Sequence, residues 1–178
     1  MSRQYYADVL TEPINADFAT ITAITETVLI PTAWTAIPAN EPRAGKMYEL
    51  LVWGTCTTGL TGTLITTPRY GTVIGGTSLG ASAAQTYVAS VTTAPFLFTA
   101  RLAFRSIGNA GANSTATVST VWTSAGTAAV AGSVTMVVGG GGAAVSVDTS
   151  VASALWIGVT FSVAPSVIPR GHIWRSLN

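Results

Sequence analysis

The stretch from Pro95 to Gly108 constrains the fold more than any other part of the chain. Its largest apolar side chains recur at every second position: Phe96, Phe98, Ala100, Leu102 and Phe104. A period of two places all of them on one face of a β-strand. Because three phenylalanines on one face require a covering layer, we expect this strand to belong to one of two packed sheets.

Residues 155–163 repeat this alternation and place Leu155, Ile157, Val159, Phe161 and Val163 on one face. Further strands are predicted from β-branched or alternating residues over 18–30, 46–56, 60–70, 81–91, 115–123, 133–138, 143–147 and 172–177. Turns rich in Gly and Pro separate them, and no segment shows a convincing helical period. The sequence predicts an all-β chain, folded as a two-sheet antiparallel β-sandwich of about eight to ten strands with jelly-roll-like connections.

Residues 1–17 differ in character from the rest of the chain. Four of the fifteen charged residues lie there: Arg3, Asp8, Glu12 and Asp17. We expect an N-terminal arm over 1–17 and a single β-sandwich domain over 18–178. Tyr5 and Tyr6 are candidate subunit or shell contacts, because aromatic side chains anchor many interfaces. The alternative is a loosely ordered terminus.

The surface of such a sandwich must contain few charges. Charged residues make up only 8 % of the chain and hydrophobic residues 48 %, whereas about 25 % charged residues is usual. No apolar run of about 18 residues escapes interruption by Thr, Ser or Gly, so no membrane span is predicted. A net charge of +1 gives no electrostatic case for nucleic-acid binding. One interpretation is that much of the surface is buried in an assembly.

Two arginines and two tryptophans are candidate contact residues. Arg101 and Arg105 share the outer face of the Pro95–Gly108 strand and are predicted to meet carboxylates of a neighbouring subunit, although a solvated face explains them as well. Trp34 and Trp174 are the tryptophans expected to be exposed and able to stack on sugar rings. The other three tryptophans, Trp53, Trp122 and Trp156, are expected to pack in the core.

Metal and cofactor sites are not predicted. Cys56 and His172 are the only Cys and His in the chain, too few for a metal cluster. Cys56 is expected to be a small buried side chain without a disulfide partner. No secretory signal precedes the domain, which predicts a protein made in the cytoplasm.

One motif points to an enzyme. Residues 76–80 match Gly-x-Ser-x-Gly, and Ser78, Asp148 and His172 follow the order of an α/β-hydrolase triad. That motif needs a strand, a sharp turn and a helix, yet residues 81–86 are too short for the helix and lead back into apolar sequence. We therefore predict no catalytic residues, and keep an esterase as the alternative enzyme class.

Five short motifs carry a resemblance to known proteins: Thr67-Pro-Arg-Tyr-Gly, Gly76-Thr-Ser-Leu-Gly-Ala, Phe104-Arg-Ser-Ile-Gly, Ala112-Asn-Ser-Thr and Arg175-Ser-Leu-Asn. Over about residues 35–178 the chain resembles a group of small structural proteins of tailed bacteriophages, notably those of actinobacteria. The motifs are turns and strand edges, so no catalytic residue is carried over.

The resemblance implies a non-enzymatic virion protein made in the host cytoplasm. It also implies a homo-oligomer, and a trimer is favoured because it would bury the uncharged faces. Its main expectation is a capsid decoration or cement protein that binds the major capsid protein, or other virion proteins, through its arm and uncharged faces. The alternative is a tail-tip or fibre module with a jelly-roll domain that binds host glycans. Trp34→Ala or Trp174→Ala would then weaken adsorption.

Overall fold

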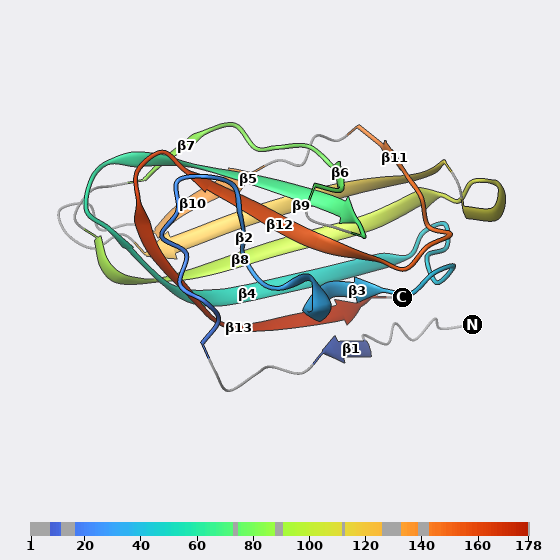
Figure 1. Cartoon of the computed structure of the whole chain (residues 1–178), viewed down its shortest axis with the longest axis horizontal. Helices are drawn as coiled ribbons and strands as arrows, with labels where there is room; N and C mark the ends of the chain where they lie inside the picture. The colour runs from blue at the N-terminus through green and yellow to red at the C-terminus, as the bar shows by residue number, and fades with distance from the viewer. Residues whose placement is uncertain are drawn as a thin grey trace.

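Two antiparallel β-sheets pack face to face in the computed structural model of the chain (Figure 1). The structure describes residues 8–11, 17–72, 75–87, 91–111, 113–125, 133–138 and 143–177. The predicted all-β sandwich is therefore confirmed. Among the described residues, no helix has the length and apolar character needed to span a bilayer.

The first sheet has seven strands. Six follow one another in space, in the order β1 (Asp8–Thr11), β13 (Pro165–Ser176), β4 (Met47–Thr58), β8 (Val91–Ser106), β9 (Ser114–Ala125) and β10 (Ser133–Val138). The seventh, β11 (Val145–Val147), also pairs with β9. The strand predicted from Pro95 to Gly108 is β8, which lies between β4 and β9 and makes long ladders with both.

The second sheet has six strands and is built around two long ones. Its main order is β2 (Thr27–Val28), β12 (Ser153–Phe161), β5 (Gly62–Gly71) and β6 (Thr77–Ser78). Two further short strands are β3 (Ala36–Ile37), which pairs with β12, and β7 (Gln85–Tyr87), which pairs with β5. Short 3-10 helices cover Thr32–Thr35 (η1) and Asn109–Gly111 (η2).

The connections combine two patterns. The chain crosses from one sheet to the other between β4 and β5, and crosses back between β12 and β13. In the sheets, β4 pairs with β13 and β5 pairs with β12. These crossing pairs agree with the predicted jelly-roll-like connectivity. Strands β8, β9 and β10 instead form a meander within the seven-stranded sheet.

The core lies between the sheets and contains the predicted alternating side chains. Phe96, Phe98, Ala100, Leu102 and Phe104 are all buried, as are Leu155, Ile157, Val159 and Phe161. Contacts between the two layers include Tyr70 of β5 against Phe104 of β8, with ring centroids 5.6 Å apart. Trp122 stacks on Phe96 at 4.4 Å, which confirms its predicted place in the core.

Two predicted elements are wrong. The strand expected over 18–30 is reduced to the two residues of β2 and one bridge from Ile21 to Val167. The apolar side chains of Ile21, Leu29 and Ile30 are still buried in the core. They pack there although most of the segment does not pair with another strand. The last strand, expected over 172–177, is also longer than predicted, because β13 begins at Pro165 and includes Pro169.

Pro169 is accommodated in that strand by a bulge. The register between β13 and β4 shifts between Pro169 and Gly171, which is a usual way to place a residue that cannot donate a ladder hydrogen bond. The prediction of about eight to ten strands also omitted the two-residue strands β3 and β6, which are too short for a detectable period.

Candidate functional site

The outward side of the seven-stranded sheet, here called the outer face, is the candidate functional surface. Its side chains lie in rows across β13, β4, β8 and β9 because the four strands pair in register. One row is charged and reads Arg175, Glu49, Arg101 and Ser119. The next two rows read Ile173, Leu51, Thr99 and Val121, and Gly171, Trp53, Leu97 and Thr123.

Glu49 is the centre of the charged row and is only 2 % exposed. Arg101 Nε donates a hydrogen bond of 2.7 Å to Glu49 Oε1. On the other side Arg175 donates to Oε2 through Nε at 2.7 Å and also through Nη2. Burial by itself would raise the pKa of Glu49, but the hydrogen bonds from Arg101 and Arg175 outweigh it and hold that pKa below 4.5. The carboxylate is therefore charged at neutral pH, and both of its oxygens are occupied.

Glu49→Gln is expected to lower the free energy of unfolding by about 2 kcal/mol at pH 7, because charge-assisted hydrogen bonds from two arginines are lost. The pKa of Glu49 is lower in the folded state than its ordinary value of 4.5. Its stabilising effect is therefore full above the unfolded pKa and disappears as the pH falls through the folded pKa. Urea unfolding of both proteins from pH 7 to pH 3 should show the difference shrinking below about pH 4.5.

The matched control is Glu26→Gln. Glu26 pairs with Arg69 at 2.8 Å, but its side chain is 34 % exposed. A pair of that exposure contributes at most about 1 kcal/mol. An effect of Glu49→Gln no larger than that of Glu26→Gln would contradict the assigned role of the buried carboxylate.

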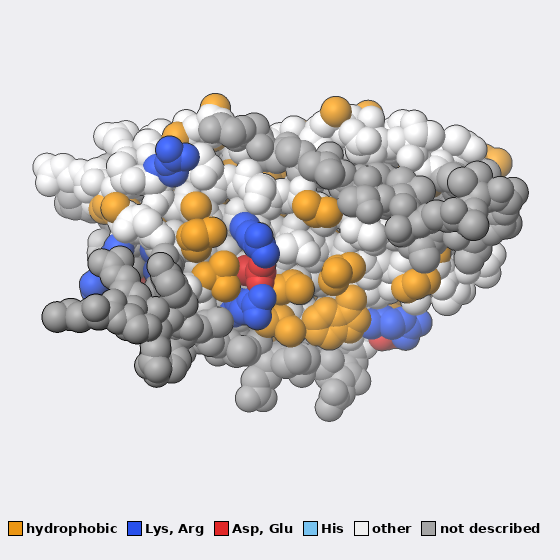
Figure 2. Space-filling model, turned by 180° about the vertical axis from the view of Figure 1, so that it is seen from behind, with side chains coloured by type: hydrophobic (Ala, Val, Ile, Leu, Met, Phe, Trp, Pro, Cys, Tyr) orange, Lys and Arg blue, Asp and Glu red, His pale blue; other side chains and the backbone are white. Residues whose placement is uncertain are grey.

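Apolar side chains surround the charged row and remain partly open to solvent. Leu97 is 43 % exposed, and Leu51, Trp53, Ile173 and Val121 are half-buried. Figure 2 shows hydrophobic side chains around an acidic side chain that is flanked by two basic ones. The Trp53 ring lies over Gly171, where a Cβ would come within 2.4 Å of it. Trp53 is thus on the outer face, and its predicted place in the core is wrong.

A shallow hollow lies beside the charged row. It has a volume of about 260 Å³ and is lined by Thr99, Arg101, Ser119 and Val121. The hollow therefore combines one guanidinium, two hydroxyls and one apolar side chain.

The outer side of the six-stranded sheet has a different character, because its tryptophan is covered. The Arg69 guanidinium lies 5.4 Å from the Trp156 ring and forms an ion pair with Glu26. Trp156 is only 1 % exposed, although it points away from the core. This sheet covers its outward aromatic with its own side chains, whereas Trp53 and Leu97 on the outer face stay accessible.

The contacts predicted for Arg101 and Arg105 with a neighbouring subunit stay predictions. Arg101 and Arg105 are exposed and alternate with core residues, as expected for an outer face. The carboxylate that Arg101 meets, however, is Glu49 of its own chain. Sequence analysis missed Glu49, although it is the one acid within a strongly apolar strand. Tyr5 and Tyr6 lie outside the described residues.

The predicted exposure of Trp174 is wrong. Trp174 is 0 % exposed, stacks on Tyr48 at 5.3 Å and donates a hydrogen bond from Nε1 to the Ala36 carbonyl. The bulge in β13 sets the alternation that turns it inward. Trp34 is half-buried in η1, and its ring lies 5.4 Å from that of His172. Neither residue stands out from the surface as a free stacking platform.

The three residues of the possible esterase motif do not form a triad. Ser78 is exposed on β6, where its Oγ accepts a hydrogen bond from the Gly80 amide. Asp148 Oδ1 accepts from the amide and the hydroxyl of Ser150. His172 belongs to the other sheet, is fully buried, and packs edge-on against Phe18 and Trp34. Burial lowers the pKa of His172, so the ring is neutral at neutral pH.

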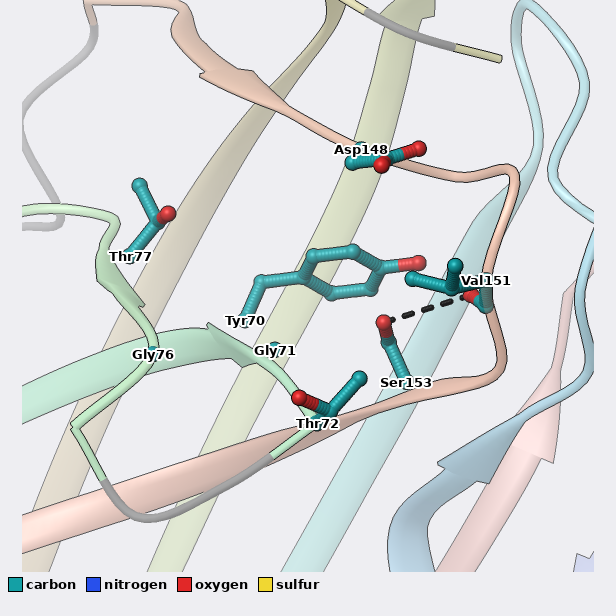
Figure 3. A pocket seen from close by; sticks show the side chains of 8 residues that line it. All are labelled: Tyr70, Gly71, Thr72, Gly76, Thr77, Asp148, Val151 and Ser153. Atoms are coloured by element: carbon teal, nitrogen blue, oxygen red, sulfur yellow. Dashed lines mark hydrogen bonds between the residues drawn. The ribbon is translucent and has the colours of Figure 1, made fainter. Parts of the chain in front are cut away.

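A second pocket lies at the end of the six-stranded sheet (Figure 3). It has a volume of about 200 Å³ and is lined by Tyr70, Gly71, Thr72, Gly76, Thr77, Asp148, Val151 and Ser153. Burial raises the pKa of the Tyr70 phenol, and Ser153 Oγ donates to the Val151 carbonyl at 3.3 Å. At about 30 Å³ per water molecule the pocket holds about seven waters, which is less volume than a drug-sized ligand needs. The nearby Ser78 contributes nothing to its lining.

Within the described part of the chain, no group of three or more His, Cys, Asp or Glu side chains is arranged to hold a metal ion. No known family model, curated protein or solved structure matches the chain. The resemblance to bacteriophage structural proteins therefore remains a prediction from the sequence motifs.

Proposed function

We propose that the chain is a non-enzymatic structural protein of a tailed-bacteriophage virion, and that it decorates and reinforces the capsid. The sandwich would bind the shell through its outer face, together with the N-terminal arm over residues 1–17. The motifs of the sequence suggest this class of protein, and the outer face supplies a surface suited to it. The proposal includes a homo-oligomer, with a trimer favoured.

The observation that carries the proposal is the exposure of apolar side chains on the outer face. Leu97 and Trp53 lie opposite each other on β8 and β4, in a row that is two rows away from the ion-paired carboxylate of Glu49. Contiguous apolar surface with a polar border is typical of protein-binding sites. On a shell that repeats the same contact many times, modest contacts of this kind give strong overall attachment.

The alternative, a tail module that binds host glycans, has less support. It relied on Trp34 and Trp174 as exposed stacking residues, and Trp174 is fully buried. The half-buried Trp34 already packs against His172 and the core cluster. The structure leaves the glycan proposal without its pair of aromatic platforms.

Blocking the outer face should prevent attachment. Ser119 is exposed at the hollow, and Ser78 is exposed on the other sheet. We expect Ser119→Cys carrying a polyethylene glycol maleimide to lose binding to particles that lack this protein, and Ser78→Cys with the same label to bind normally. Labelling is selective because Cys56 is buried, which raises its pKa to about 11.

The measurement is co-sedimentation of the purified protein with phage particles. The particles are produced from the phage whose genome would encode the chain, after the gene for the chain has been deleted. Unlabelled protein must bind for the proposed function to hold. If both labelled variants bind equally well, the outer face is not the docking surface. If the unlabelled protein fails to bind purified particles, the decoration proposal itself is wrong.

A further inference from the structure

Contacts within the described part of the chain satisfy only one of the hydrogen-bonding nitrogens of Arg101. Its Nε donates to Glu49, whereas Nη1 and Nη2 make no hydrogen bond with any described residue. The side chain is 58 % exposed and forms one wall of the hollow between β8 and β9. The two free nitrogens lie at the end of a planar guanidinium, a geometry that binds a carboxylate with two parallel hydrogen bonds.

The position of Arg101 is also fixed before any partner arrives. Glu49 is buried and is held from the opposite side by Arg175, so its Oε1 is a firm anchor for Arg101 Nε. A guanidinium anchored in this way loses less side-chain freedom on binding than a free surface arginine. Arg105, on the same strand and face, has no ion-pair partner among the described residues.

A second copy of the chain docked through this same face does not complement the site. The charged row contains two arginines and one carboxylate, so two such rows brought together would repel each other. Both oxygens of Glu49 already accept hydrogen bonds from the chain's own arginines. A second copy therefore has no carboxylate to offer from the same face.

Apolar groups beside the hollow restrict the partner further. Val121 lines it directly, and Leu97 lies on the same face, one row beyond Thr99. If binding is to bury Val121 and Leu97, the partner side chain that reaches Arg101 must have apolar neighbours of its own. Desolvation by those groups would strengthen the charge-assisted hydrogen bonds.

We infer that Arg101 receives an Asp or Glu side chain from a different protein, carried by a segment whose neighbouring side chains are apolar. This inference rests on the proposed function, in which the partner is a protein of the virion shell. The carboxylate would occupy the hollow and accept hydrogen bonds from Nη1 and Nη2 of Arg101. Glu49 would hold the guanidinium in place and act as a positioning residue.

The first test compares Arg101→Gln with Arg105→Gln in full-length protein. Loss of two charge-assisted hydrogen bonds should weaken binding to the particles described above by about ten-fold or more. Arg105→Gln should bind within about two-fold of the unaltered protein, since no hollow or anchor involves it. The difference between unaltered and Arg101→Gln protein should also shrink as salt rises. Equal affinities for the two variants would overturn the inference.

A second test identifies the partner and does not depend on the stability of Arg101→Gln. A small diazirine-bearing amino acid at position 119 is activated on bound particles, and the cross-linked peptides are read by mass spectrometry. We expect peptides of another virion protein that contain an Asp or Glu among apolar residues. Cross-links to a second copy of this chain, or to a segment without a carboxylate, would contradict it. Failure of the unaltered protein to bind would instead refute the proposed function.

Discussion

Phe98→Ala is expected to lower the free energy of unfolding by about 3–5 kcal/mol. Phe98 is 0 % exposed and is the second of the five alternating core residues of β8, and its ring is near that of Trp122. Truncation removes a large apolar side chain and leaves a cavity that the surrounding sheets cannot close, because both layers are fixed by their ladders. Urea unfolding followed by tryptophan fluorescence measures the change.

The matched control is the next residue in the chain. Leu97 belongs to the same strand but points to the outer face and is 43 % exposed. Leu97→Ala should cost less than about 1 kcal/mol. Similar losses for the two variants would mean that the two faces of β8 are not distinguished, and the sandwich described here would be wrong.

Gly54→Ala is expected to destabilise the protein by about 3 kcal/mol or more, or to prevent folding. A Cβ at position 54 would lie 2.1 Å from the Ile168 carbonyl oxygen and 2.9 Å from the Pro169 Cα. Both are backbone atoms of β13, the strand that pairs with β4 at this point. Backbone atoms in a ladder cannot move aside as the end of a side chain can, so the whole pairing must shift.

Gly59→Ala provides the comparison for that variant. Gly59 follows the same strand, and a Cβ there would meet nothing within 4 Å. Thermal unfolding should show a change of less than about 1 kcal/mol. A tolerated Gly54→Ala would show that β13 and β4 are farther apart than their ladder implies.

The sequence predicted the sandwich because its strongest signals are local. Alternation over Phe96–Phe104 and Leu155–Phe161 identifies a strand and its buried face without knowledge of any partner. The exposure predicted for Trp174 was wrong, because a bulge at Pro169 shifts the register before that residue and its side chain is buried. Such a shift depends on pairing with another strand and leaves no period in the sequence.

The candidate site was harder to predict because it spans strands far apart in the chain. Glu49, Arg101 and Arg175 meet only when β4 lies between β8 and β13. An acidic residue in an apolar strand can be recognised in the sequence as a candidate buried charge. Its partners Arg101 and Arg175 can be identified only when the order of the strands in the sheet is known. The prediction for Trp53 was wrong because both faces of its strand carry apolar side chains. In the structure Trp53 alternates with the buried residues of β4 and points outward.

We propose that the outer face docks onto another protein of the virion. The most direct test is an electron cryomicroscopy map of particles that carry the full-length chain. We expect the outer sides of β4, β8 and β9 to contact another virion protein, with a carboxylate at Arg101. A map in which Trp53, Leu97 and Arg101 face open solvent would contradict it.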